Sequence, residues 1–313
     1  MSPQITSYQP TDQPGVLRTL AEAMPVDPIS ESRFVRQVLL DANFRAEGAP
    51  VARIGDEVVG FCLSLARQVP LENAPSDAER GYITLFAVAP KFQRQGIGTK
   101  LLEHAENYLR SQNRKLCMIS PYAPGYFTCG VDVKAYAGAV SFFAKHGYAE
   151  VYRPIAMEIA LWDFSVPEWV SEKHRKLIEA GVTVEPYRSE LTLPLLEFAA
   201  REFAGDWVRV VRETMAKIQL GENPARIMIA HQQGRVIGYS HHDNERFGPI
   251  GVAADQRGRG IGQVLMYETL RAQRLAGFRT AWFLWSDDKT AAKIYSAAGF
   301  REVRRFALMK KEL

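Results

Sequence analysis

The sequence predicts two copies of one mixed α/β domain, each with a mixed sheet flanked by helices. Two observations lead to this prediction. The chain has 313 residues, enough for two domains of about 150 residues each. Three blocks of sequence also recur in the same order in its two halves. The chance similarity of a single glycine-rich loop would not produce three ordered matches, so we interpret the chain as an internal duplication.

The three repeated blocks alternate between strand-like and helix-like patterns. The aligned pairs are Val51–Gly60 with Ile229–Gly238, Val88–Gly98 with Val252–Gly262, and Phe142–Tyr148 with Ile294–Phe300. The first pair has two apolar runs around a polar turn, which predicts a strand pair. The second leaves an apolar strand, passes through G-I-G and opens an apolar helical pattern. The third ends at Gly147 or Gly299, where a helix-ending glycine is expected.

The same order of elements is therefore expected in each copy. Opening strands are predicted at Ile5–Tyr8 and Val182–Tyr187, followed by helices such as Ser32–Asn43 and Leu193–Phe203. After the strand pair come third strands at Tyr82–Val88 and Pro249–Ala253, and helices at Thr99–Ser111 and Gln263–Ala276. Further strands are predicted at Leu116–Ile119 and Thr280–Trp285, and final strands at Ile155–Ala160 and Phe306–Lys310. We expect domains at 1–161 and 181–313, joined by a partly helical linker at 162–180.

Composition and charge narrow the functional class. Apolar residues make up 47%, charged residues 24%, and the net charge is +4. This mild excess suits a small anionic ligand better than nucleic acid. Cys62, Cys117 and Cys129 are odd in number and lack C-x-x-C spacing, so neither a disulfide framework nor a structural zinc site is expected. A reduced, cytoplasmic location follows from this cysteine usage.

No membrane segment is expected from the sequence. The first residues, M-S-P-Q-I-T, have neither the basic nor the apolar region of a signal peptide. The longest uncharged run, Leu116–Val131, is broken by prolines and glycines and would not form a membrane helix.

The two G-I-G loops, Gln93–Lys100 and Arg257–Val264, are suited to an anion. A loop that opens a helix offers unpaired backbone N–H groups and the positive end of the helix dipole. Glycines let a phosphate approach closely, and the flanking basic residues add charge. Neither loop has the third glycine of a dinucleotide fold, which argues against a nucleotide-dependent oxidoreductase. Neither follows the Walker order, in which lysine precedes the hydroxyl residue.

The remaining pattern, [Q/R]-x-x-G-x-G after a strand, resembles the GNAT superfamily of N-acetyltransferases, and the resemblance covers most of the chain twice. It implies that each loop holds the pyrophosphate of acetyl-CoA. The cofactor-binding residues implied in the second copy are Ile250, Val252, Arg257, Gly258, Arg259, Gly260, Ile261, Gly262, Gln263 and Asp288. Those implied in the first copy are Val88, Gln93, Arg94, Gln95, Gly96, Gly98, Thr99 and Lys100.

The second copy carries the features that the resemblance associates with catalysis. Tyr295 occupies the position of the family's tyrosine acid, and a phenol with a pKa of about 10 can protonate a leaving thiolate. The alternative is that Tyr295 only packs the helix against the sheet. Asp288 either contacts the cofactor or caps a helix. The strand Ile250–Val252 is expected to pair with the pantetheine arm, beside Pro249, which cannot donate a hydrogen bond.

The general base is sought in H-H-D-N-E, which precedes this strand. Glu245 is the first candidate and His242 the second, and a solvated polar loop is the alternative for either. Adjacent histidines followed by Asp243 could suggest a metal, but neighbours on a strand face opposite sides, so no metal is expected.

The first copy departs from the family at the tyrosine position, where it has Phe143. Tyr136 could substitute from another angle. The first copy also carries an aromatic loop, Pro121–Asp132, for which packing is expected, with an acceptor pocket or closure of the interface between the copies as alternatives. Cys129 lies in it, but no paired histidine is evident.

We therefore expect an acetyl-CoA-dependent N-acetyltransferase with catalysis in the second copy and a small primary amine as partner. Tandem members of the family act on amino sugars and on small thiol-precursor amines, and an amino sugar is the substrate we expect. The alternative is a duplicated acyl-CoA-binding sensor without catalysis. No nucleic-acid or membrane partner is expected, and the chain is expected to be a monomer or homodimer.

Overall fold

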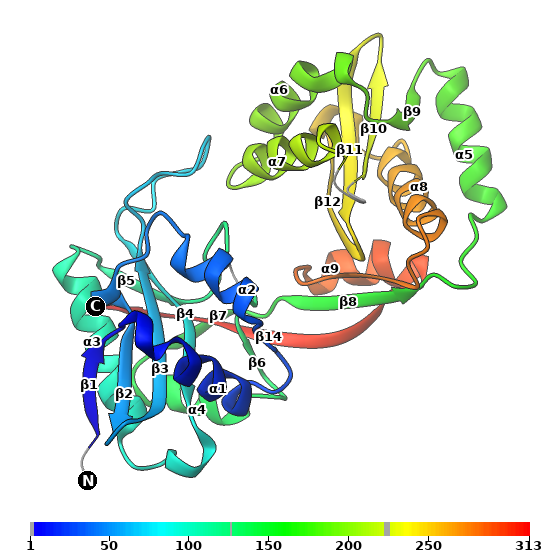
Figure 1. The fold of residues 1–313 in the computed structure, drawn as a ribbon. Coiled ribbons are helices and arrows are strands. Elements are labelled where there is room, and N and C mark those ends of the chain that lie inside the picture. The colour runs from blue at the N-terminus through cyan, green and yellow to red at the C-terminus, as the bar shows by residue number, and fades with distance from the viewer. Residues whose placement is uncertain (1–2, 126, 222–225) are drawn as a thin grey trace. The chain divides into compact units, whose positions relative to one another are not determined.

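A computed structural model describes residues 3–125, 127–221 and 226–313. The chain forms two compact units (Figure 1). The N-terminal unit comprises Met1–Pro70, Ser76–Pro154 and Arg305–Leu313, and the C-terminal unit comprises Leu71–Pro75 and Ile155–Arg304. Each unit has a mixed sheet covered by helices, which confirms the predicted fold class.

The sheet of the N-terminal unit has the order β1-β2-β3-β4-β5-β14, and β6 and β7 also pair with β14. Its strands are β1 (Gln4–Ser7), β2 (Pro50–Ile54), β3 (Glu57–Ala66), β4 (Arg80–Val88), β5 (Leu116–Ile119), β6 (Val131–Asp132), β7 (Ala149–Tyr152) and β14 (Arg301–Glu312). Strands β1 to β4 are antiparallel neighbours, whereas β4 and β5 are parallel.

The sheet of the C-terminal unit has the order β9-β10-β11-β12-β13-β8. Its strands are β8 (Ile155–Ala160), β9 (Thr183–Pro186), β10 (Arg226–Gln232), β11 (Arg235–Asp243), β12 (Arg246–Val252) and β13 (Thr280–Phe283). Again the fourth and fifth strands of the copy, β12 and β13, are parallel. The two copies thus have the same topology up to their last strand.

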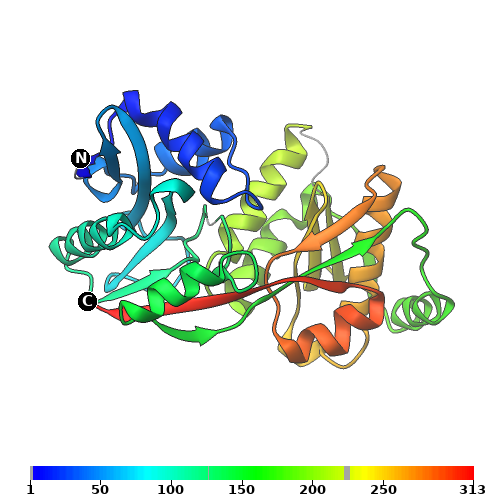
Figure 2. The ribbon, with the colours of Figure 1, turned by 90° about the horizontal axis from the view of Figure 1, so that it is seen from below.

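The last strands of the copies are exchanged. β8, the final strand of the first copy, pairs with β13 in the C-terminal unit. β14, at the end of the chain, pairs with β5 and β7 in the N-terminal unit (Figure 2). The structure therefore differs from the expected partition into 1–161 and 181–313 at both copy ends.

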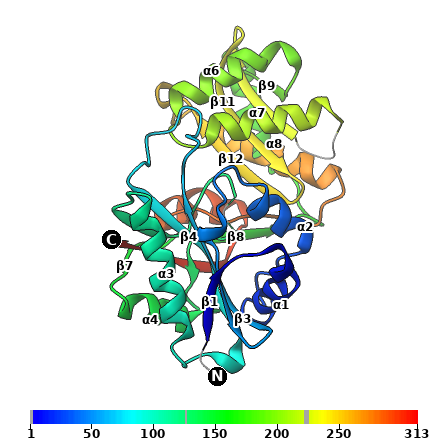
Figure 3. The same ribbon diagram turned by 60° about the vertical axis from the view of Figure 1, so that its left-hand side comes forward.

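Helices cover both faces of the sheet in the N-terminal unit (Figure 3). On one face, α1 (Gln13–Ala23) and α2 (Glu31–Phe34) pack over a cluster that includes Phe61 and Leu63. A π-helical turn, Val35–Leu39, continues α2 over most of the helix expected at Ser32–Asn43. On the other face, α3 (Ile97–Ser111) and α4 (Ala137–Lys145) bury the other side of the sheet.

The C-terminal unit repeats this layering. Helices α6 (Thr192–Glu202) and α7 (Trp207–Gln219) cover one face, and α8 (Ile261–Leu275) covers the other. The short α9 (Asp288–Thr290) is followed by π and 3-10 turns up to Gly299. The expected linker contains α5 (Glu168–Glu179), which buries Val170 and Leu177 against the α8 side. The linker is therefore an integral helix of this unit.

In each unit the parallel strand pair separates toward the G-I-G loop, forming what we call the fork. β4 and β5 pair from Arg80 to Ile83, and β4 then continues to Val88. In the described residues, β12 and β13 are paired at a single position, Arg246 with Trp282. The strand that leads into each loop thus leaves one backbone edge available to a ligand.

Candidate functional site

The two G-I-G loops have nearly the same backbone. Gly96 and Gly260 precede α3 and α8 with φ of 81° and 85°. Two residues earlier, Arg94 and Gly258 are also left-handed, at 63° and 83°. Alternating left-handed residues turn successive N–H groups toward one point, which makes a cradle for an anion. The loops therefore share the geometry predicted from their sequence.

Each loop is fastened to its strand by one side chain. Gln93 Nε2 donates to the Val88 carbonyl at 3.0 Å, and Arg257 Nε donates to the Val252 carbonyl at 3.4 Å. These residues occupy equivalent positions in the two copies. They shape the loop through these bonds, a role that the sequence alone did not distinguish from direct contact with phosphate.

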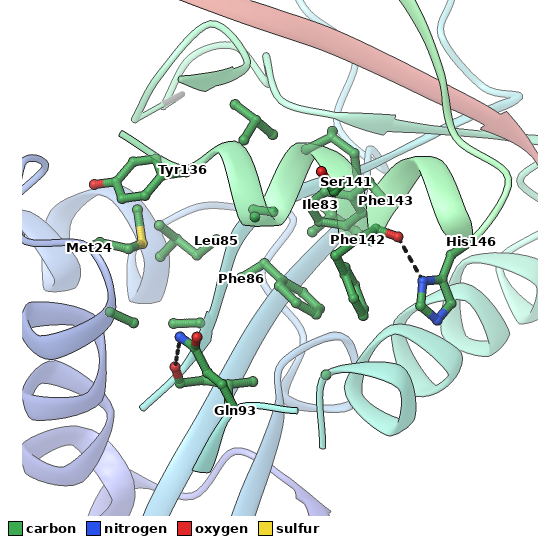
Figure 4. A pocket seen from close by; sticks show the side chains of 18 of the residues that line it. Met24, Ile83, Leu85, Phe86, Gln93, Tyr136, Ser141, Phe142, Phe143 and His146 are labelled. Atoms are coloured by element: carbon green, nitrogen blue, oxygen red, sulfur yellow. Dashed lines mark hydrogen bonds between the residues drawn. The ribbon is translucent and has the colours of Figure 1, made fainter. Parts of the chain in front are cut away.

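The fork of the N-terminal unit contains a cavity of about 880 Å³ (Figure 4), within the usual size range of small-molecule sites. One end is bounded by the loop and by Phe142 and His146 from α4. His146 Nδ1 lies 2.8 Å from the Phe142 carbonyl, and its Nε2 lies 3.2 Å from Thr99 Oγ1. If Nδ1 carries the proton, Nε2 accepts from the threonine and steadies the first turn of α3.

Most of the residues predicted to bind cofactor in the first copy line this cavity. They are Val88, Gln93, Arg94, Gly96, Gly98 and Thr99. Gln95 and Lys100 are not among its lining residues; Gln95 Nε2 instead donates to the Lys91 carbonyl at 3.3 Å. His146 was missed, although its place directly before Gly147 marks the end of α4.

The other end of the cavity is more polar than expected from a packing surface. Thr84 lies at an irregularity in the pairing of β3 with β4. Its hydroxyl is buried and has no hydrogen-bond partner among the described residues. Tyr136 also lines this end, and its hydroxyl donates to Asp27 Oδ2 at 2.9 Å.

Phe143 and the aromatic loop contribute mainly packing. Phe143 is buried and its ring lies 5.2 Å from that of Phe86. In the loop, Tyr122 is fully buried and bonded to Asn43 and Asp41. Thr128, Gly130 and Val131 of the same loop line the cavity, and an acceptor pocket there stays a prediction.

In the C-terminal unit the fork is less buried than in the N-terminal unit. Gly248 to Val252 are all partly exposed, whereas the equivalent Thr84 to Val88 are mostly buried. This includes Ile250 and Val252, predicted to pair with the cofactor. On the α6–α7 face, the Phe203 ring packs so closely on Gly251 that a β-carbon there would lie 2.2 Å from it.

Tyr295 lies in an aromatic cluster with Phe247, Phe283 and Phe300. Its ring centroid is 4.4 Å from that of Phe283. Burial, with a smaller contribution from Asp287, raises the pKa of the Tyr295 phenol to about 12. Its hydroxyl makes no hydrogen bond within the described ranges. The packing role is therefore observed, and the phenol retains a proton to donate at neutral pH.

The two candidate bases do not lie together with Tyr295 in one cluster. Glu245 lies in the turn between β11 and β12, where β12 and β13 are still paired. Glu245 therefore precedes Gly248, the first partly exposed residue of the fork, by three residues, or about 10 Å of extended chain. His242 is fully buried, with Nδ1 3.1 Å from the Asn244 carbonyl and its ring facing Phe278. Burial lowers the pKa of His242 to about 4. Both assignments stay predictions.

Asp287, directly before Asp288, caps the start of α9. Asp287 accepts hydrogen bonds from the Thr290 backbone at 2.7 Å and the Thr290 hydroxyl at 3.0 Å. The backbone bond to Thr290 lowers the pKa of Asp287. Over the part of the chain that is described, no three His, Cys, Asp or Glu side chains are placed to hold a metal ion.

Strand β11 carries a row of buried polar side chains where the first copy is mostly apolar. Tyr239, Ser240, His241 and His242 replace Phe61, Cys62, Leu63 and Ser64. Each member of the row has a buried polar atom without a partner in the described structure. Burial, then the charge of Arg246, lowers the pKa of His241 to about 3.

No helix among the described residues has the length and apolar character needed to cross a membrane. The three cysteines are buried, and none of them forms a disulfide.

Two family models match the chain, each in one copy. Residues 17–148 match a model described as acetyltransferase (GNAT) family, and residues 223–302 match one described as acetyltransferase (GNAT) domain. A mycothiol acetyltransferase from Nocardia farcinica is 35% identical over 124 residues, 37% of this chain. The match spans 39% of that relative's length.

Solved structures with similar folds cover nearly all of this chain. A fungal glucosamine N-acetyltransferase region of a β-N-acetylglucosaminidase has a TM-score of 0.81 at 20% identity, covering 99% of this chain and 38% of that one. A GCN5-related N-acetyltransferase from Sphaerobacter thermophilus has a TM-score of 0.69 at 19% identity, covering 99% and 95%. A tandem GNAT protein from the clavulanic acid biosynthesis pathway has a TM-score of 0.66 at 18% identity, covering 99% of this chain and 98% of that one.

Proposed function

This chain belongs to the GNAT acetyltransferase family and is a tandem N-acetyltransferase; from that premise we propose that it transfers the acetyl group of acetyl-CoA directly to a small primary amine. We place the transfer in the C-terminal unit. The observation that carries this proposal is the opened parallel strand pair ending in an anion-binding loop, which occurs in both units.

The residues of each fork fit the cofactor. Two left-handed positions and the first turn of α3 or α8 offer N–H groups to a pyrophosphate. The free edge of β4 or β12 offers backbone groups to a pantetheine amide. Acetyl-CoA supplies the activated thioester when it is bound.

The chain's own groups in the C-terminal unit account for the remaining requirements. A backbone N–H on the free edge of β12 can donate to the thioester oxygen as negative charge develops there. The amine nitrogen bonds to the carbonyl carbon, and the bond from that carbon to sulfur breaks. The Tyr295 hydroxyl donates its proton to the departing sulfur. The amine nitrogen loses one proton to solvent as the amide forms, and solvent returns a proton to the Tyr295 phenolate. The first copy has Phe143 at this position, which cannot donate a proton.

The acceptor that we propose is an amino sugar or a similarly small amine. The fungal structure of similar fold is described as a glucosamine N-acetyltransferase region, and the bacterial relative as a mycothiol acetyltransferase. These descriptions support a small amine but belong to those proteins. Cytoplasmic location and a monomeric or dimeric state are part of the same proposal.

Replacing Tyr295 with Phe tests the proposed acid. The ring packing against Phe283 is kept, so the fold and cofactor binding are expected to be unchanged. Loss of the proton donor is expected to lower kcat by roughly 100-fold or more. The measurement is release of CoA with a panel of amines that includes glucosamine. An unchanged kcat would remove Tyr295 from the mechanism.

The second candidate function, acyl-CoA binding without transfer, is favoured by one observation: the 880 Å³ cavity lies in the unit with phenylalanine at the acid position. The two functions differ in outcome. Tight acetyl-CoA binding with no CoA release by the unaltered protein, for any amine, would favour the sensor. Release abolished by Tyr295→Phe would favour the transferase.

A further inference from the structure

The two G-I-G loops carry their positive charge at different positions: the first has Arg94 and Lys100, and the second has Arg257 and Arg259. Lys100 follows the first loop, whereas the equivalent position after the second is Val264. His146, which contacts the first turn of α3, is replaced by Ala298. The C-terminal loop has nevertheless gained a cation from another element, helix α5.

Lys173 of α5 reaches the start of α8. Its Nζ donates to Gln263 Oε1 at 2.7 Å, and Gln263 is the third residue of α8. A β-carbon added to Gly260 would lie 3.2 Å from Lys173 Cδ and 3.8 Å from its Nζ. At the equivalent Gly96, an added β-carbon would meet nothing within 4 Å.

The position of Lys173 is set by the packing of α5. Val170 and Leu177 are buried on the same helix face as Lys173, three residues before and four after it. The Trp169 ring packs edge-on against Tyr267 of α8 at 5.5 Å. The Lys173 ammonium also lies 5.2 Å from the Trp169 ring centroid. The side chain is thus held at the loop by both helices.

The positive charge of the Lys173 ammonium lies at the start of α8, where the surroundings are already positive. The start of a helix carries partial positive charge, and a cation there is unfavourable unless an anion is also present. Within the described residues, Lys173 forms no ion pair with a carboxylate. Arg257 and Arg259 of the loop add to the positive charge. The arrangement is balanced only when an anion occupies the cradle.

We infer that Lys173 is a cofactor-binding residue of the C-terminal unit, contributing from outside the duplicated fold a cation at the start of α8, where the first copy has Lys100 at the start of α3. This inference rests on the proposed function, because the anion is the diphosphate of acetyl-CoA. Helix α5 is then part of the binding site of the second copy.

The test measures acetyl-CoA binding to the full chain through tryptophan fluorescence. All five tryptophans, Trp162, Trp169, Trp207, Trp282 and Trp285, lie in the C-terminal unit, so this signal does not report binding in the N-terminal one. Lys173→Met is expected to raise the Kd by roughly 10- to 100-fold. Lys173→Arg is expected to restore most of the affinity. Lys176→Met, on the exposed side of α5, removes the same charge and is expected to change little.

Two further measurements separate binding from packing and locate the phosphate. Raising the ionic strength should weaken binding more in the unaltered protein than in Lys173→Met, because only the former loses a screened attraction. The loss of affinity caused by Lys173→Met should be equal for CoA and 3′-dephospho-CoA, because both ligands carry the diphosphate.

Three outcomes would overturn the inference. The first is an unchanged or lower Kd in Lys173→Met, and the second is the same loss of affinity in Lys176→Met. The third is a loss of affinity in Lys173→Met for CoA but not for 3′-dephospho-CoA, which would assign Lys173 to the 3′-phosphate. If acetyl-CoA does not change the fluorescence of the unaltered protein, the proposed cofactor fails in this unit. The role of Lys173 then fails with it.

Discussion

At the scale of residues, the two copies differ most where one strand turns polar. Tyr239 and His241 face the α6–α7 side of the C-terminal unit, where the first copy has Phe61 and Leu63 in its core. A buried polar group without a partner costs stability, so its presence is a liability to the fold. The sequence showed these residue types, but their burial depended on packing by α6 and α7.

The two histidines of this row make stability depend on pH. The folded pKa values, about 3 for His241 and about 4 for His242, lie below the unfolded value of 6.5. The unfolded chain therefore binds more protons below pH 6.5, and stability present above that pH is lost as pH falls toward these values. Each histidine contributes at most about 1.4 kcal/mol per pH unit.

His241→Leu, which installs the residue of the first copy, should reduce this dependence. We expect the variant to lose less stability than the unaltered protein between pH 6.5 and 5, by roughly 1 to 2 kcal/mol. Urea unfolding followed by tryptophan fluorescence measures it. Identical pH profiles for the two proteins would show that His241 does not remain neutral when buried.

At the scale of elements, the loop and the helix that follows act together. The residues Gly98 and Gly262 are the second residues of α3 and α8. A β-carbon at Gly98 would touch the Phe142 ring at 3.4 Å, and one at Gly262 would touch Val252 at 3.4 Å. Both contacts are ordinary, so alanine fits the fold at either position. Packing therefore does not require glycine at either position, in agreement with the proposed approach of a phosphate.

Alanine substitutions at Gly98 and Gly262 distinguish acetyl-CoA binding in one unit from binding in the other. Gly98→Ala and Gly262→Ala should each keep or slightly raise stability, because alanine favours a helix by about 1 kcal/mol over glycine. Each should lower acetyl-CoA affinity at least tenfold in its own unit, since the methyl group keeps phosphate from the backbone. Calorimetric titration gives the number of sites, and only Gly262→Ala should alter the tryptophan response. Unchanged binding in both variants would contradict the proposed phosphate cradle.

At the scale of the whole molecule, the exchanged strands tie each unit to residues far away in sequence. β14 supplies Phe306, Ala307 and Met309 to the core of the N-terminal unit. Lys311 of β14 also pairs with the buried Glu106 of α3 at 2.7 Å. The N-terminal unit is therefore incomplete until the end of the chain is present.

Removing residues 305–313 should unfold the N-terminal unit selectively. The deletion exposes the edges of β5 and β7, strips apolar contacts from the core and leaves Glu106 without Lys311. Far-ultraviolet circular dichroism should fall substantially, while the tryptophan emission of the C-terminal unit stays native. Lys310→Ala, an exposed position on the same strand, serves as the control. Equal loss of both signals in the deletion would contradict independent units.

The sequence alone determined the duplication, the order of elements and the two loops, because these depend on local periodicity and on glycines at fixed spacing. Leu116–Ile119 and Ile155–Ala160 were predicted with the bounds observed. Only the tertiary structure decided which unit each last strand completes. Two similar copies present similar sheet edges, so local pattern cannot say which one a strand will join. The same limit applies to Lys173, whose partner is 90 residues away and is reached only because α5 packs on α8.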